Sequence, residues 1–176
     1  MGSIQKPLNV KLFMGIMYHK RMNLKEILQE ICEEFGQQDR FLGPVDFEWS
    51  HYYEQEMGKD LLKYYTTFST PIDRDQLPSI KLFTNQLEAK WAKNECRAVN
   101  IDPGYIARDK LVLASTKDFY HRLYLSDGIF GEVTLHYRKG VFRYFSWTYP
   151  DYKEPKIVNF LEMARADLVH DLRNQG

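Results

Sequence analysis

Cysteine is scarce in this chain, and the marks of several protein classes are missing. Cys32 and Cys96 are the only cysteines, which gives neither a disulfide framework nor a zinc-ligand pair. No stretch approaches the roughly 20 apolar residues that a membrane span requires, and residues 1–7 lack the apolar core of a signal peptide. The formal net charge is +0, so no overall field draws the chain to nucleic acid or to an anionic membrane. We therefore expect a cytoplasmic protein without a membrane partner, in which any binding of nucleic acid is local.

Several catalytic signatures are absent as well. A P-loop needs Gly-x-x-x-x-Gly-Lys-Ser/Thr, and no such run occurs. Thr116-Lys-Asp118 lacks the Asn-Lys-x-Asp order of a guanine site, so we exclude a classical GTPase. No histidine begins a His-x-Thr or His-x-Ser pair, which argues against two-histidine phosphoesterases, and no Gly-x-Ser-x-Gly elbow is present.

The chain does have enough apolar material for one core. Its 176 residues are 44% hydrophobic and 15% aromatic, which predicts a single folded domain over residues 1–176. Asn23 and Glu26 form a capping box that opens a helix, and Gly36 ends it. A second helix is expected from about Pro78. Strands are expected over residues 10–18, 45–49, 64–69 and 97–101, and Gly43-Pro44 is expected to be the turn that leads into the second of them.

This order of elements predicts an α+β fold with a ferredoxin-like βαββαβ core, in which two helices cover one face of an antiparallel sheet. Four further strands, joined by tight turns, predict an antiparallel β-meander that either extends this sheet or forms a second layer. A C-terminal helix is expected from about Pro155. The four meander strands are predicted over residues 110–115, 120–125, 129–137 and 141–149.

Polar residues inside these strands suggest where a functional site lies. Asn100 and Asp102 fall on one side of a strand, just before a turn predicted at Pro103-Gly104. A carboxylate held in this way suits a divalent cation, a ligand hydroxyl or the role of a base. The alternative is an Asx turn, in which Asp102 bonds only to its own backbone.

A second group of polar residues follows in the meander. Lys117 and Arg122 are suited to bind a phosphate or carboxylate, Asp118 to act as a base or cation ligand, and His121 to act as an acid. Strand alternation places Glu132, Thr134, His136 and Arg138 on one face, where they line either a pocket or a solvated surface with cross-strand ion pairs.

These considerations define three sets of candidate residues. The candidate catalytic residues are Asp102, Asp118, His121 and Glu132. The candidate ligand-binding residues are Arg97, Asn100, Tyr105, Lys117, Arg122, Thr134 and Asp151. Glu54 and Glu56 are candidates to join Asp102 around Mg²⁺ or Mn²⁺, and the alternative is that both are exposed loop charges.

A string of short motifs gives the chain a family resemblance that covers nearly its whole length. The chain resembles the prokaryotic family catalogued as domain of unknown function 4416. That resemblance implies no activity, because the family is uncharacterised. The motifs are Val10-Lys-Leu-Phe, Tyr53-Glu-Gln-Glu-Met-Gly58, Ile80-Lys-Leu with Thr84-Asn85 and Leu87-Glu88, Val99-Asn-Ile-Asp-Pro-Gly-Tyr105, Lys110-Leu-Val-Leu-Ala, Lys117-Asp118, Glu132-Val-Thr-Leu135 and Trp147-Thr-Tyr-Pro-Asp-Tyr152.

Three kinds of function are consistent with these residues. The first, which we favour, is the binding or processing of a phosphorylated or nucleotide-like small molecule in a polar pocket on the sheet, with Mg²⁺ or Mn²⁺ as a candidate cofactor. The second is a non-catalytic domain that binds RNA or a nucleotide on the sheet face, although no RNP-like aromatic motif is visible. The third is an interaction module whose aromatic-rich meander pairs with a partner or with itself.

Overall fold

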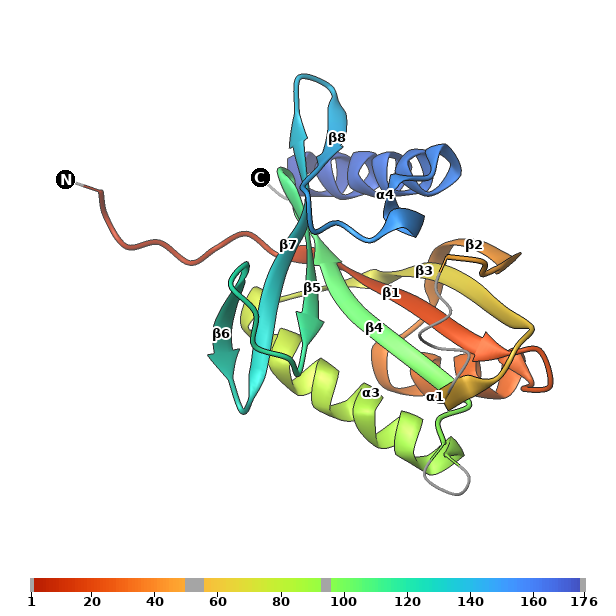
Figure 1. The fold of residues 1–176 in the computed structure, drawn as a ribbon. Coiled ribbons are helices and arrows are strands. Elements are labelled where there is room, and N and C mark those ends of the chain that lie inside the picture. The colour runs from red at the N-terminus through yellow and green to blue at the C-terminus, as the bar shows by residue number, and fades with distance from the viewer. Residues whose placement is uncertain (1, 50–55, 93–95, 175–176) are drawn as a thin grey trace.

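The computed structural model describes residues 2–49, 56–92 and 96–174. Its centre is an antiparallel sheet with the strand order β2-β3-β1-β4-β5-β7-β6, and β8 pairs with β7 (Figure 1). The helices are α1 (Leu24–Phe35), α3 (Leu77–Trp91) and α4 (Pro155–Asn174), with short 3-10 segments η1 (Arg74–Gln76) and η2 (Pro150–Lys153). The strands are β1 (Val10–His19), β2 (Gln38–Asp46), β3 (Leu61–Ile72), β4 (Val99–Ile106), β5 (Lys110–Ser115), β6 (Arg122–Ser126), β7 (Ile129–Arg138) and β8 (Val141–Tyr144).

The two faces of the sheet are covered by different helices (Figure 1). Ile27 of α1 and Ile80 of α3 pack on one face against Leu12 and neighbouring strand residues. Leu161 of α4 packs on the other face against Phe13. Because β1 is buried on both faces, its sequence is a nearly continuous apolar run rather than an alternating one.

The first half of the chain has the predicted α+β organisation. The order β2-β3-β1-β4, with α1 and α3 on one face, is compatible with the predicted ferredoxin-like core. The helix predicted from its capping residues is confirmed, because the Asn23 side chain accepts a hydrogen bond from the Lys25 amide and Gly36 follows the last turn with φ 85°.

The prediction for β2 was wrong. Gly43-Pro44 does not precede a strand at residues 45–49 but lies inside β2, which begins at Gln38. The pairing of β2 with β3 shifts register between Leu42 and Val45, so the proline occupies an irregularity. β2 is an edge strand, where a residue without an amide hydrogen is tolerated.

The meander extends the same sheet and does not form a second layer. Its last strand ends at Tyr144 instead of reaching residue 149, because the chain turns at Phe145, whose carbonyl accepts from the Thr148 amide. None of the helices in the described part of the chain is long and apolar enough to cross a membrane. The cytoplasmic location remains a prediction.

An irregularity in β7 changes which residues share a face. The β5–β7 register shifts between the pairs Leu111–Leu135 and Val112–Val133. Val133 consequently packs near α3, whereas Leu135 packs with the residues of α4. The prediction that Glu132, Thr134, His136 and Arg138 share one face therefore fails beyond Thr134.

Candidate functional site

The candidate site lies where β4 and β5 separate. These strands pair only from Gly104–Leu113 to Ile106–Leu111, although β4 begins five residues earlier, at Val99. Amide groups of alternate residues point to the same edge of a strand, and the Ile101 amide points away from β1 to a helix. Pro103 therefore lacks an amide hydrogen on the edge that faces β5, and the ladder cannot continue past it.

Asp102-Pro-Gly104 is thus a fork in the sheet and not the predicted turn. Pro103 and Gly104 both lie within β4. A Cβ atom added at Gly104 would lie 2.3 Å from the Val112 carbonyl oxygen, so only glycine permits β5 to approach there. β4 and β5 are therefore paired at Gly104 and separate at Pro103. Asp102 lies next to the opening between them.

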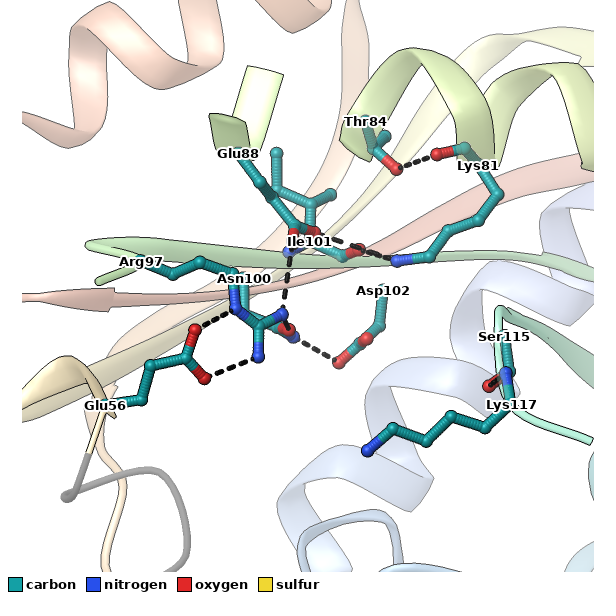
Figure 2. A network of polar contacts seen from close by, with 10 residues as sticks. All are labelled: Glu56, Lys81, Thr84, Glu88, Arg97, Asn100, Ile101, Asp102, Ser115 and Lys117. Carbon is teal, nitrogen blue, oxygen red and sulfur yellow. Dashed lines mark hydrogen bonds and ion pairs between the residues drawn. The ribbon is translucent and has the colours of Figure 1, made fainter. Parts of the chain in front are cut away.

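Helix α3 takes the place of β5 along the released edge of β4. The Ile101 amide donates to Glu88 Oε1 at 2.8 Å, and Lys81 Nζ donates to the Ile101 carbonyl oxygen at 2.7 Å (Figure 2). Burial raises the pKa of Glu88, against the opposing effects of Lys81 and of the Ile101 amide. Two charged side chains thus satisfy a backbone edge that would otherwise be exposed inside the fork.

The fork contains a pocket of about 150 Å³. It reaches from α3 on one face of the sheet to η2 on the other, so residues far apart in sequence meet in it. Its polar and charged lining residues are Lys63, Lys81, Asn85, Glu88, Arg97, Asn100, Asp102, Ser115, Thr116, Lys117, Arg122, Glu132 and Asp151, with the tyrosines Tyr149 and Tyr152.

A hydrogen-bonded chain leads from Glu56 to Asp102 along one wall of this pocket. The Arg97 guanidinium binds the Glu56 carboxylate through Nε and Nη2, at 2.6 and 2.8 Å. Arg97 Nη1 also donates to Asn100 Oδ1 at 2.8 Å, and Asn100 Nδ2 donates to Asp102 Oδ2 at 3.0 Å (Figure 2). Asn100 therefore orients the Asp102 carboxylate, and Asp102 makes no ion pair with the described residues.

Glu56→Gln is expected to cost about 0.5–1 kcal/mol of stability near pH 7. The hydrogen bond from Arg97 lowers the pKa of Glu56 below its ordinary value of 4.5. A carboxylate with a lowered pKa stabilises the fold above its ordinary pKa, and this contribution is lost as the pH falls through the folded-state value. Urea unfolding should therefore show a difference between Glu56→Gln and wild type at pH 7 that disappears in acid. An equal difference at both pH values would contradict this assignment.

Glu132 holds a second cluster at the opposite wall. The carboxylate accepts from Arg122 Nε at 2.9 Å and from Thr134 Oγ1 at 3.2 Å, and it contacts His121 Nε2 at 3.0 Å. Arg122 Nη1 also donates to Ser115 Oγ and to the Lys117 carbonyl oxygen. Arg122 thereby fixes the turn that carries Lys117, and in Figure 2 the Lys117 side chain extends into the space below Asp102.

A third cluster lies deeper, between β3 and η2. Lys63 Nζ and the Tyr65 hydroxyl both donate to Asp151 Oδ2, at 2.7 and 2.8 Å, and all three side chains are buried. Burial, followed by the Asp151 charge, raises the pKa of Tyr65 far above its ordinary value, so its hydroxyl stays protonated. Lys63 and Tyr65 did not figure among the predicted site residues.

The structure brings most of the predicted residues to this pocket. Arg97, Asn100, Asp102, Lys117, Arg122, Glu132 and Asp151 line it. Three further predicted residues do not line the pocket but contact residues that do. His121 and Thr134 contact Glu132, and Glu56 binds Arg97. Asp118 is exposed on the segment before β6, and Tyr105 packs into the core beside Leu77 and Val112.

Only two of the three predicted metal ligands, Asp102 and Glu56, lie among the described residues. Glu54 lies outside the described residues, and Glu56 is paired with Arg97. Among the described residues, no group of three His, Cys, Asp or Glu side chains is arranged to hold a metal ion. Any cation at Asp102 would therefore need ligands from elsewhere, such as the oxygens of a bound phosphate.

Lys63, Lys81 and Glu88 were missed by the sequence analysis. A signal for the two helical residues did exist, because Lys81, Thr84 and Glu88 are spaced by three and four residues and form one stripe of α3. All three are buried. A polar stripe beside the apolar face of a helix indicates that the helix covers polar groups. Lys63 has no comparable local signal.

The chain is thus an α+β protein with an antiparallel sheet that opens into a polar, charge-lined pocket between β4 and β5. It belongs to the family described as "Domain of unknown function (DUF4416)", whose model matches residues 8–168. This match confirms the family resemblance seen in the sequence motifs. No curated protein and no solved structure matches the chain.

Proposed function

We propose that the fork pocket binds a small phosphorylated molecule. The observation that carries this proposal is the gathering of cationic side chains among the described residues that line the pocket. Five are Lys or Arg and four are Asp or Glu, namely Lys63, Lys81, Arg97, Lys117 and Arg122 against Glu88, Asp102, Glu132 and Asp151. Phosphate oxygens are preferred partners of lysine and arginine donors, particularly where a pocket limits access of water.

Lys117 and Arg122 are the groups best placed to meet the phosphate. Arg122 uses Nε and Nη1 for Glu132, Ser115 and Lys117, and its Nη2 group makes no hydrogen bond to the described residues. Lys117 reaches the pocket from the turn that Arg122 holds. Arg97 is a weaker candidate, because its donors are already directed at Glu56, Glu88 and Asn100.

The size of the pocket restricts the ligand. Sites for drug-sized molecules enclose about 300–1,000 Å³, whereas this pocket has about 150 Å³. That volume suits a phosphate with a few attached carbon atoms. A nucleotide would place only its phosphate and adjoining atoms inside the pocket and leave its base outside.

Asp102 supplies a place for a divalent cation in this proposal. Mg²⁺ is commonly held by one or two carboxylates together with substrate phosphates rather than by a complete cage of protein ligands. Asp102 lies in the same pocket as Lys117 and is oriented by Asn100. Mg²⁺ or Mn²⁺ shared between Asp102 and a phosphate would link binding of the metal to binding of the ligand.

A thermal-shift screen tests this function. Sugar phosphates, nucleotides and acidic metabolites are measured with and without Mg²⁺ or Mn²⁺. A phosphorylated compound present at about 100 times its Kd should stabilise the fold by about 2.7 kcal/mol, which raises Tm by several degrees. Lys117→Ala should remove this rise, and Asp102→Asn should remove the part that depends on metal.

Lys25→Ala, on the exposed surface of α1, is the matched control and should leave the rise unchanged. If no phosphorylated compound raises the Tm of the wild-type protein, the proposed function is wrong. It is also contradicted if Lys117→Ala and Lys25→Ala respond alike.

A macromolecular partner is the second candidate, because aromatic residues are exposed near β6. Tyr120 is 86% exposed and Tyr124 62% exposed, and Phe119 lies on the same connection. Such rings suit stacking on unpaired RNA bases or packing against a protein. A single-stranded RNA oligonucleotide added to the screen separates this candidate from the first, since it should not compete with a phosphorylated compound in the fork pocket.

A further inference from the structure

The hydroxyl group of Tyr152 is a buried polar group that has no hydrogen-bond partner among the described residues. Tyr152 belongs to η2, lines the fork pocket and is 1% exposed. Its Oη atom is buried and makes no hydrogen bond to any described residue. Such a group costs free energy unless a partner is supplied, so it indicates a place where a bound molecule makes a contact.

The position of this hydroxyl depends on Gly15 of β1. A Cβ atom at Gly15 would lie 3.0 Å from Tyr152 Oη and 3.5 Å from Lys63 Cε. Gly15 pairs with Asp102 on one side and with Tyr65 on the other. The hydroxyl therefore lies over the centre of the sheet, between the strand that carries Asp102 and the strand that carries Lys63.

The carboxylates of Asp102, Asp151 and Glu132 line the same pocket as Tyr152. Its pKa is raised well above the ordinary tyrosine value, first by burial and then by Asp151, with Asp102 and Glu132 acting in the same direction. The group therefore stays protonated and has a hydrogen to donate. Asp151 Oδ2 already accepts from Lys63 and Tyr65, and Asp102 Oδ2 accepts from Asn100.

The groups around the Tyr152 hydroxyl favour one kind of ligand group over others. An ammonium group would suit the carboxylates but offers no lone pair to the Tyr152 hydroxyl. A phosphate or carboxylate oxygen accepts a hydrogen bond but is repelled by Asp102 and Asp151. An alcohol hydroxyl satisfies both demands, since it can accept from Tyr152 and donate to a carboxylate.

We infer that the ligand of the fork pocket is a polyhydroxylated phosphate, such as a sugar phosphate or a polyol phosphate, an inference that rests on the proposed function. One of its hydroxyl groups accepts from Tyr152 and donates to Asp102. Its phosphate lies at the other wall, with Lys117 and Arg122. The pocket then binds both ends of the ligand, because acidic groups contact the alcohol and basic groups contact the phosphate.

Calorimetric titration with three probes tests this inference. The probes are propyl phosphate, which has no free alcohol, glycerol 3-phosphate and ribose 5-phosphate. The wild-type protein should bind at least one hydroxylated probe about tenfold or more tightly than propyl phosphate. Tyr152→Phe should remove most of that preference and leave the affinity for propyl phosphate unchanged. Tyr124→Phe, which alters an exposed tyrosine, should bind all probes as wild type does.

The outcomes separate this inference from the proposed function. If propyl phosphate and the hydroxylated probes bind equally, or if Tyr152→Phe keeps the full preference, the inference fails while phosphate binding stands. If none of the three probes binds while another phosphorylated compound raises the Tm in the screen, the inference fails and the proposed function stands; if no phosphorylated compound binds at all, both fail. Folding of the variant supplies a further check, because removal of an unpartnered hydroxyl should not lower Tm. A large drop in the Tm of Tyr152→Phe would show that the hydroxyl is bonded within the protein, and this would overturn the inference.

Discussion

Glu132→Ala is expected to lower the free energy of unfolding by about 3–5 kcal/mol. Glu132 is 2% exposed and accepts hydrogen bonds from Arg122 and Thr134, while it also contacts His121. Removing its carboxylate leaves the Arg122 guanidinium buried without its anionic partner, which is far more costly than the loss of a surface ion pair. Urea unfolding at pH 7 measures the change.

Asp118→Ala is the control for this prediction. Asp118 is exposed and close in sequence to the same turn, so its removal should change stability by no more than about 0.5 kcal/mol. Equal effects of Glu132→Ala and Asp118→Ala would contradict the assignment of Glu132 as a buried structural anion. That assignment also means that loss of ligand binding in Glu132→Ala is no sign of a catalytic role.

Gly104→Ala is expected to cost about 3 kcal/mol or more, at the upper end of the range for overpacked sites. Its added Cβ atom would lie 2.3 Å from the Val112 carbonyl oxygen and 2.7 Å from Leu113 Cδ2. The contact with Val112 is to backbone, so β4 and β5 must move apart and the fork must widen. Urea unfolding measures the loss of stability, and the response to a phosphorylated ligand reports the change in the pocket.

Gly131→Ala provides a matched comparison in the same sheet. The three atoms nearest to a Cβ atom at Gly131 would all belong to the side chain of Leu125, at 3.3 to 3.5 Å. Because a leucine side chain can rotate away, we expect a much smaller loss of stability than at Gly104. If the two variants lose stability to the same extent, close approach of the strands at Gly104 does not define the fork.

Most of the elements of this fold could be predicted from local pattern. Helix α1 shows its capping residues and β5 is a short, mostly apolar segment, and both were predicted with the bounds that the structure has. Elements beside irregularities were predicted less well. Gly43-Pro44 looked like a boundary because proline usually ends regular structure, yet an edge strand accommodates it.

The candidate site was only half visible in the sequence, for a physical reason. Asp102 and Glu132 are polar residues within apolar strands, and that contrast is local. Lys63 and Lys81 belong to the site because β3 and α3 are brought to it by strand pairing and helix packing, which no local pattern reports.

Two local signals near the site were present but were interpreted wrongly. Pro103-Gly104 was taken for a turn, although within a paired strand the same two residues open the sheet. Strand alternation was extended through all of β7, but the irregularity near Val133 reverses the faces beyond Thr134. In both cases the partner strand decides the outcome, and the sequence of one strand does not show it.

A crystal structure of the protein with the phosphorylated compound that gives the largest thermal shift, grown with Mg²⁺, tests the central claim most directly. We predict that the phosphate density lies in the fork between β4 and β5, within hydrogen-bond distance of Lys117 or Arg122 and on the side of the pocket opposite Tyr152. Density for the compound at any other place, with the fork residues unchanged from their arrangement in the free protein, would contradict the claim.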